Sequence, residues 1–151
     1  MLLELNEKGV HPSMVTTNGT MLNEKNVAAL IEGKVDLVSV SLDGTVKEVY
    51  EEIRKNANYE RVAAGVRYLF EERARRGSEL PRIILRMIRM DKTEADVEAF
   101  KVLWTPWLRP GDEIAFSNYQ TWNGSVKDRR VEEPAGMVAL RKGHQGPCRM
   151  L

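Results

Sequence analysis

The chain alternates short apolar runs, typical of buried strands, with longer segments whose apolar residues recur at helical spacing. The clearest strand is predicted over 35–42, a nearly continuous run of Val and Leu typical of a strand covered on both faces. Residues 59–76 carry apolar side chains three and four positions apart, which predicts an amphipathic helix that stops at Gly77. Such alternation favours right-handed crossovers and a parallel sheet.

The same pattern assigns the remaining elements. It predicts further strands over 13–17, 82–89 and 113–117, and further helices over 1–8, 24–32, 45–54 and 94–104. Asn23 and Thr93 are expected to cap two of these helices. Beyond Asn118 the periodicity stops, and we expect a C-terminal segment that is mostly loop. About four strands are too few for a closed eight-stranded barrel, but they could form half of one.

Composition and charge exclude several classes of protein. The chain has 151 residues, of which 42% are hydrophobic and 30% charged, as in ordinary globular domains. A net charge of +1 argues against a nucleic-acid partner. No apolar run approaches the roughly 20 residues of a membrane span, and the first residues lack the features of a signal peptide. We therefore expect a cytoplasmic protein without a membrane partner.

Candidate chemistry gathers where the predicted strands end, because parallel α/β folds bind ligands at the carboxyl ends of their strands. The polar residues at these ends are Thr16, Thr17, Asn18, Ser41, Asp43, Arg86, Arg89, Asp91, Ser117, Asn118, Tyr119 and Gln120. They would suit a ribose, an amino-acid headgroup or an amide. Thr-Asn-Gly and Asp-Gly are also common turns, so each has a purely structural interpretation. Ser41 lies inside an apolar strand, where a buried hydroxyl needs a partner.

Several common sites are missing from the sequence. It contains neither a Walker-type phosphate loop nor a GxGxxG motif, and no Cys/His cluster with zinc-ligand spacing. The two histidines, His11 and His144, lie far apart and are expected at the surface. Trp104 and Trp107 are expected in the core. Cys148 is the only cysteine, so the chain forms no internal disulfide.

A family resemblance joins these observations. The segments TTNGTML, VDLVSVSLDGT, YEEIRKNANYERVAAGVRYLFEER and PRIILRMIRMDKTEADVEAFKVLW, in this order, resemble the middle and second half of the radical S-adenosylmethionine (radical SAM) barrel. The nearest resemblance is to members with a C-terminal SPASM extension, whose start the closing GPCRML resembles. It implies a partial (β/α) barrel over 1–117, the C-terminal half, followed over 118–151 by a linker and the start of a SPASM-like region.

The resemblance also implies a chemistry. Such enzymes bind S-adenosylmethionine (SAM) on a reduced [4Fe–4S] cluster and form a 5′-deoxyadenosyl radical that abstracts hydrogen from a substrate. SPASM members often modify peptides or proteins, or mature other enzymes, and a flavodoxin or ferredoxin would supply the electron. The residues implied to bind the cofactor are Thr17 and Asn18 near its methionine or ribose, Ser41 and Asp43 at its ribose and carboxylate, Arg54 at its carboxylate, Val40 and Leu85 beside its adenine, and Arg86 facing the pocket. Cys148 is implied to help bind an auxiliary iron–sulfur cluster.

The chain departs from the family pattern in one large respect. It lacks the CxxxCxxC motif that holds the cluster, and one cysteine cannot replace three thiolates. We therefore expect an internal piece of a larger enzyme, inactive alone, whose partners are the missing N-terminal half of the barrel and the C-terminal extension. Because half a barrel leaves sheet edges and apolar side chains uncovered, the isolated chain is expected to dimerise or aggregate.

Two other interpretations stay open. The chain could be a degenerate half-barrel that binds a partner or a peptide without catalysis, which the missing cluster ligands favour. A different barrel lyase or aldolase would need a lysine or a metal-ligand set at the strand ends, and the sequence does not supply one there.

Overall fold

The computed structural model describes residues 13–118 as one parallel sheet covered by helices. The four strands, in the sheet order β1-β2-β3-β4, are β1 (Met14–Thr17), β2 (Leu37–Ser41), β3 (Arg82–Arg89) and β4 (Glu113–Asn118). The helices are α2 (Glu24–Glu32), α3 (Lys47–Ile53), α4 (Tyr59–Arg75) and α5 (Val97–Trp104), with two 3₁₀ turns, η1 (Glu94–Asp96) and η2 (Thr105–Trp107). The predicted α/β fold with about four parallel strands is confirmed.

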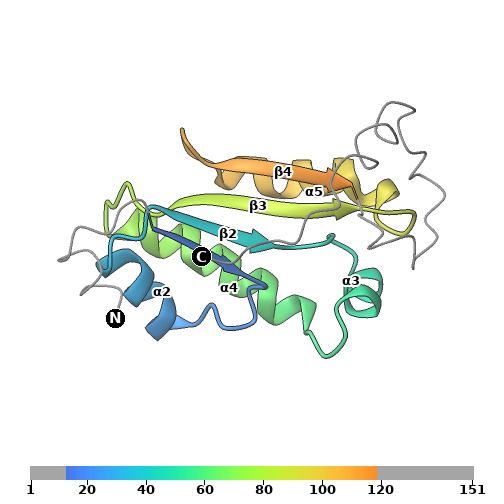
Figure 1. The fold of residues 1–151 in the computed structure, drawn as a ribbon, viewed down its shortest axis with the longest axis horizontal. Coiled ribbons are helices and arrows are strands. Elements are labelled where there is room, and N and C mark those ends of the chain that lie inside the picture. Colours follow the sequence, from blue (N-terminus) through green and yellow to red (C-terminus); the bar gives the residue numbers. More distant parts are fainter. Residues whose placement is uncertain (1–12, 119–151) are drawn as a thin grey trace, which may run out of the picture.

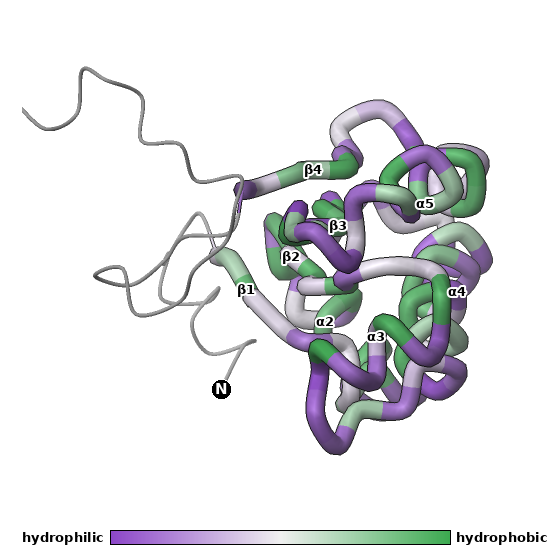
Figure 2. Tube along the Cα trace, turned by 90° about the vertical axis from the view of Figure 1, so that its right-hand side faces the viewer, coloured by the Kyte–Doolittle hydropathy of each residue, from purple (hydrophilic) through white to green (hydrophobic). Residues whose placement is uncertain are grey.

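The helices all lie on one side of the sheet, so the described part of the chain has two layers (Figures 1 and 2). The core fills the space between the layers. Its fully buried members from the sheet are Val38, Val40, Ile83, Leu85 and Met87, and its members from the helices include Val27, Val66, Leu69, Phe100 and Trp104. The expected core position of Trp104 is confirmed, whereas Trp107 is only partly buried and packs against the core from outside. No helix in 13–118 is long and apolar enough to cross a membrane.

Side chains on a strand alternate between the two faces of the sheet, so the positions between these core residues lie on the opposite face. Pairing in register places Thr16 beside Ser39 and Ile84, then Ser41 beside Arg86 and Ala115. We call this side the open face, because no described helix covers it (Figure 2). Its residues are Met14, Thr16, Leu37, Ser39, Ser41, Arg82, Ile84, Arg86, Ile88, Glu113, Ala115 and Ser117.

Several predicted boundaries need correction. The second strand begins at Leu37 rather than at 35, because the Val35 amide donates to the Leu30 carbonyl and closes the turn after α2. The helix expected over 45–54 begins at Lys47, since Thr45 bonds elsewhere. The helix predicted over 1–8 and the loop segment beyond 118 lie outside the described residues.

Of the two predicted helix caps, only one makes a side-chain capping hydrogen bond. Asn23 does cap α2, since its side-chain oxygen accepts a hydrogen bond from the Asn26 amide at 3.0 Å. Thr93 is no cap. Its buried hydroxyl accepts from the Met90 amide at 3.0 Å and donates to the Ile88 carbonyl at 2.9 Å. Thr93 therefore closes the loop after β3, and the chain passes through η1 before α5 begins.

A buried ion pair joins helix α4 to the amino ends of β3 and β4. Arg73 and Asp112 are 2% and 1% exposed, and two parallel bonds of 2.8 and 2.6 Å link guanidinium and carboxylate. The backbone amides of Ile83 and Arg109 also donate to Asp112. Burial opposes the ionisation of Asp112, but the hydrogen bonds from Arg73 and the two amides outweigh it, so its pKa is lowered. The pair stabilises the fold only while Asp112 is ionised.

We expect Asp112→Asn to lower the free energy of unfolding by about 3 kcal/mol at pH 7, because it leaves a buried guanidinium without its counter-charge. A lowered folded-state pKa stabilises the protein above the unfolded value of about 4 and loses that contribution as pH falls through the folded value. The gap between variant and wild type should therefore narrow between about pH 4 and pH 2. Urea unfolding of the full chain across this range measures it. A gap independent of pH would contradict the assignment, and Glu98→Gln, at an exposed ion pair, is the control.

Helix α4 approaches the loop between β1 and α2 at a glycine. A Cβ on Gly65 would lie 2.6 Å from the carbonyl oxygen of Leu22 and 2.9 Å from its Cβ, closer than atoms can pack. Gly65 is buried and lies in the middle of α4, where glycine otherwise weakens a helix. The close contact therefore explains why a glycine stands here.

Gly65→Ala should destabilise the chain by about 1–3 kcal/mol, because the added methyl must push α4 away from a backbone carbonyl. Helix propensity alone predicts the opposite, a gain of about 1 kcal/mol. The neighbouring Ala64 is exposed, so Ala64→Gly reports propensity by itself. Urea unfolding of both variants separates the effects, and a stabilised Gly65→Ala protein would disprove the contact.

Candidate functional site

Asp43 organises the carboxyl edge of the sheet. It follows β2, and its side chain is 1% exposed. One carboxylate oxygen accepts from Nε and Nη2 of Arg54 at 2.7 and 2.5 Å, and the other accepts from the Ile88 amide at 2.8 Å. The carboxylate thus joins the end of β2 to the residue after α3 and to the end of β3. We call this the Asp43 junction.

A second carboxylate fixes the turn that follows. Both the backbone amide and the hydroxyl of Thr45 donate to Asp96 in η1, whose side chain is buried. Gly44, which lies between Asp43 and Thr45 in the chain, has φ +127°, and a Cβ there would lie 2.7 Å from a carboxylate oxygen of Asp96. Only glycine combines that conformation with so close an approach. The loops after β2 and β3 are therefore held together at two points.

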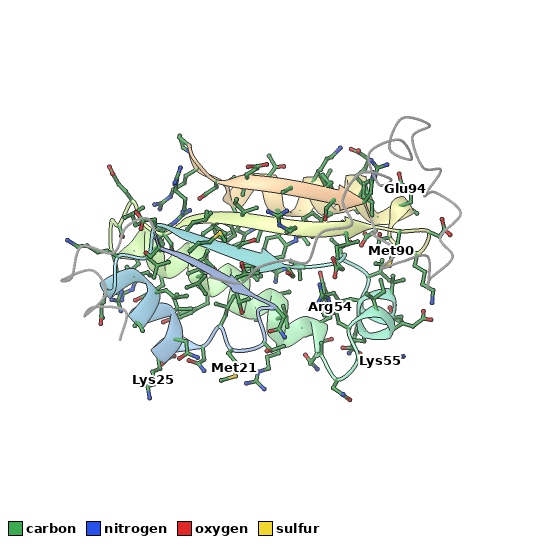
Figure 3. All side chains as sticks on the ribbon, in the orientation of Figure 1. Met21, Lys25, Arg54, Lys55, Met90 and Glu94 are labelled. Atoms are coloured by element: carbon green, nitrogen blue, oxygen red, sulfur yellow. The ribbon has the colours of Figure 1, made fainter. Side chains whose placement is uncertain are left out.

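The loop after β3 is tied to α3 as well. Lys92 forms an ion pair with Glu52, and the hydrogen bond from Lys92 lowers the pKa of that carboxyl. Figure 3 shows Arg54 and Lys55 at the end of α3, with Met90 and Glu94 nearby at the same end of the sheet. The exposed side chains at this edge include several of both charges, so the edge as a whole is polar.

The turn after β1 uses its polar side chains internally. The Thr17 hydroxyl accepts from the Gly19 amide at 3.1 Å, and the Asn18 side-chain oxygen accepts from the amide and hydroxyl of Thr20 at 3.1 and 2.7 Å. Gly19 has φ +79° and is buried, and a Cβ there would lie 2.8 Å from Val62. This matches the structural interpretation of Thr-Asn-Gly as a turn. The side-chain amide nitrogen of Asn18 makes no hydrogen bond within the described residues.

The remaining predicted residues divide between the two faces of the sheet. Ser41 and Arg86 are in-register partners on the open face, near the Asp43 junction. Val40 and Leu85 are also partners, but both are 0% exposed and pack in the core beneath the helices. Their side chains therefore face away from the open face, and the expected place of both residues beside an adenine stays a prediction. Cys148 lies outside the described residues.

Asp43 is already engaged within the fold, because its two oxygens accept bonds from Arg54 and Ile88 and its side chain is almost completely buried. Its expected place beside the ribose and carboxylate of the cofactor stays a prediction. Arg54 keeps further N–H groups and is 31% exposed, which leaves it able to bind an anion. Asp43 thus orients Arg54.

Two residues at this edge, Asp96 and Thr45, could not be identified as important from the sequence. Asp96 belongs to an acidic helix start, whose charge suits the helix dipole, and nothing in the sequence distinguishes it from its acidic neighbours. Thr45 follows an Asp-Gly turn and offers no separate signal. The spacing of 51 residues between them becomes a contact only when β2 and β3 pair.

Comparison with known proteins identifies the family. A model of the radical SAM superfamily matches residues 1–100. The chain belongs to the radical SAM superfamily.

Solved structures agree on the fold of this radical SAM chain. A crystal structure of Streptococcus suis SuiB superimposes with a TM-score of 0.66 and 16% identity, covering 93% of this chain and 30% of SuiB. A structure of SuiB bound to S-adenosylmethionine gives the same TM-score and identity, covering 93% of this chain and 31% of SuiB. The chain therefore spans about a third of the length of the structures it matches. No curated protein matches it.

The described residues of this radical SAM chain do not fit an iron–sulfur cluster. Within 13–118 no three His, Cys, Asp or Glu side chains lie close enough to hold a metal ion. The carboxyl edge does fit part of SAM, which carries hydroxyls, an amine and a carboxylate. Ser41 offers a hydroxyl there, and Arg54 offers a fixed positive charge that the junction orients.

A double-mutant cycle on Asp43 and Arg54 should give a coupling energy of about 2–3 kcal/mol, because the carboxylate is buried and two guanidinium nitrogens donate to one of its oxygens. The exposed pair Glu98 and Lys101 has the same charges and should couple by about 0.5 kcal/mol or less. Alanine substitutions and urea unfolding provide both values. Equal coupling in the two pairs would show that the junction is an ordinary surface ion pair.

Proposed function

We propose that this chain forms part of a radical SAM enzyme that binds SAM along the carboxyl edge of its sheet and modifies a peptide or protein. The observation that carries the proposal is the Asp43 junction, which presents Arg54 at the edge where parallel α/β folds bind ligands. Membership of the superfamily and the SAM-bound state of SuiB support it.

In this proposal the chain's own residues hold the methionine end of SAM. Arg54 binds the carboxylate through the N–H groups that Asp43 leaves free, and the Ser41 hydroxyl donates a further hydrogen bond. Asp43 and Asp96 act indirectly, because they fix the loop that carries Gly44 and Thr45. When bound on its cluster, SAM supplies the hydrogen-abstracting radical chemistry of the family.

The cluster ligands would come from elsewhere in a longer polypeptide. This part of the proposal has two supports, the short share of SuiB that the chain spans and the missing CxxxCxxC motif. Cys148 would then bind an auxiliary cluster in a SPASM-like region over 118–151. A flavodoxin or ferredoxin would donate the electron. The mass of the polypeptide in its source cells tests this directly, because an excerpt predicts a mass well above that of 151 residues.

The second candidate is a half-barrel that binds a partner or peptide without catalysis. The lack of a metal-holding cluster in 13–118 favours it. The two candidates differ in one measurable property, since only the first requires SAM to bind.

We expect Ser41→Ala to weaken SAM binding about fivefold or more, because it removes a hydrogen bond to a charged or strongly polar group. Isothermal titration calorimetry on the complete polypeptide, reconstituted with iron and sulfide without oxygen, measures this. Ser39→Ala is the matched control, since Ser39 lies on the same strand and face but two residues farther from the edge. Its affinity should stay within about twofold of wild type. Failure of the wild-type protein to bind SAM would favour the non-catalytic candidate.

A further inference from the structure

We propose that Arg86 binds an anionic group of the substrate, a carboxylate or a phosphate, on the open face of the sheet. The inference deepens the proposed function and rests on it, because it assigns the class of group that the substrate presents inside the enzyme.

The position of Arg86 is central on this face. It is in register with Ser41 on β2 and with Ala115 on β4, so neighbouring strands flank it on both sides. The positions two residues before and after it on β3 are Ile84 and Ile88, both partly buried. Among its open-face neighbours, Arg86 is therefore a long cation rising from a surface of small, hydroxyl and aliphatic side chains.

Its guanidinium has no partner of its own within 13–118. It forms no hydrogen bond or ion pair with another described residue, and Glu113, on the same face two positions before Ala115, does not pair with it. Most other arginines here behave differently. Those bound to a carboxylate are Arg54, Arg73, Arg75, Arg76 and Arg89. Arg86 and Arg82, both on the open face of β3, are thus charges without a carboxylate partner among residues 13–118, and Arg86 is the one that lies nearer the carboxyl edge.

The cost of such a charge explains why a ligand is needed. Arg86 is exposed among the described residues, but in the complete barrel that the proposed function assumes the open face would line the interior, where an ion without a counter-charge is disfavoured. Arginine cannot escape this cost by losing its proton, because a guanidinium stays protonated in proteins. Its planar fork matches a carboxylate or phosphate in two parallel hydrogen bonds. An anion that enters with the substrate would remove the cost at the moment of binding.

The cofactor is the other possible source of a carboxylate. Arg54 already stands at the carboxyl edge with its orientation fixed by Asp43, and it suffices for the methionine end of SAM. Arg86 lies on the sheet itself, on β3, whereas Arg54 follows α3. We therefore assign Arg86 to the substrate, and the test below separates the two sources.

The first measurement uses inorganic phosphate as the probe. The side-chain Nε–H signals of the full chain are followed by nitrogen-15 NMR during a phosphate titration at constant ionic strength. The Arg86 signal should shift saturably, and Arg86→Gln should raise the dissociation constant about tenfold or more. Arg82→Gln is the control, because Arg82 begins the same strand on the same face and also lacks a carboxylate partner among the described residues. It should change the constant by less than about twofold.

The second measurement separates the sources of the anion. Arg86→Gln should bind SAM and decarboxylated SAM as wild type does, within about twofold. A loss confined to SAM would overturn the assignment to the substrate, since the cofactor carboxylate would then be the partner. If wild type binds neither compound, the proposed function fails, while the phosphate titration still decides the anion site.

A third measurement asks whether the chain itself supplies the anion. Arg86→Met keeps the length of the side chain and removes its charge. Urea unfolding without phosphate should give the same or a higher midpoint than wild type. A clear drop would reveal an ion pair within the chain and overturn the proposal, as would phosphate shifts that are equal at Arg82 and Arg86.

Discussion

The carboxylate of Asp43 is the contact on which the carboxyl edge of this sheet depends. It is buried, yet it joins the end of β2, the residue after α3 and the backbone of β3. Parallel strands meet at this edge only through their loops, which have no hydrogen-bond ladder of their own. A buried charge with three donors supplies the missing constraint, because moving any one element would leave that charge unsatisfied. Arg54 owes its fixed position to this geometry.

The opposite edge of the sheet is also fixed by a buried aspartate paired with an arginine. There Asp112 accepts from Arg73 in α4 and from the amides of Ile83 and Arg109, so the amino ends of β3 and β4 are fixed to the helix layer. Each edge therefore carries a buried carboxylate paired with an arginine from a helix or its end. The two pairs differ in one respect. Arg73 is closed off from solvent, whereas Arg54 is about a third exposed and keeps donors for another group.

Placing all helices on one side has a direct consequence for chemistry. Buried aliphatic and aromatic side chains fill the helix side of the sheet, so we place no ligand there. The open face carries hydroxyls and an arginine without a described partner. We therefore place the proposed function of this radical SAM chain on the open face and the carboxyl edge, while the helix layer holds the strands in register.

The sequence by itself determined the elements and their order. Runs such as LVSVS and the helical spacing in 59–76 depend on local preferences and on burial, which a single chain displays directly. The sequence also indicated Ser41 and Arg86 as polar candidates at the strand ends, whereas Arg54 came only from the family resemblance; the roles of all three stay proposals. Only the tertiary structure decided which face each strand residue occupies, moving Val40 and Leu85 to the core and leaving Ser41 and Arg86 open. It alone brought Asp96 to Thr45, since contacts between residues far apart in sequence arise from strand pairing and leave no local pattern.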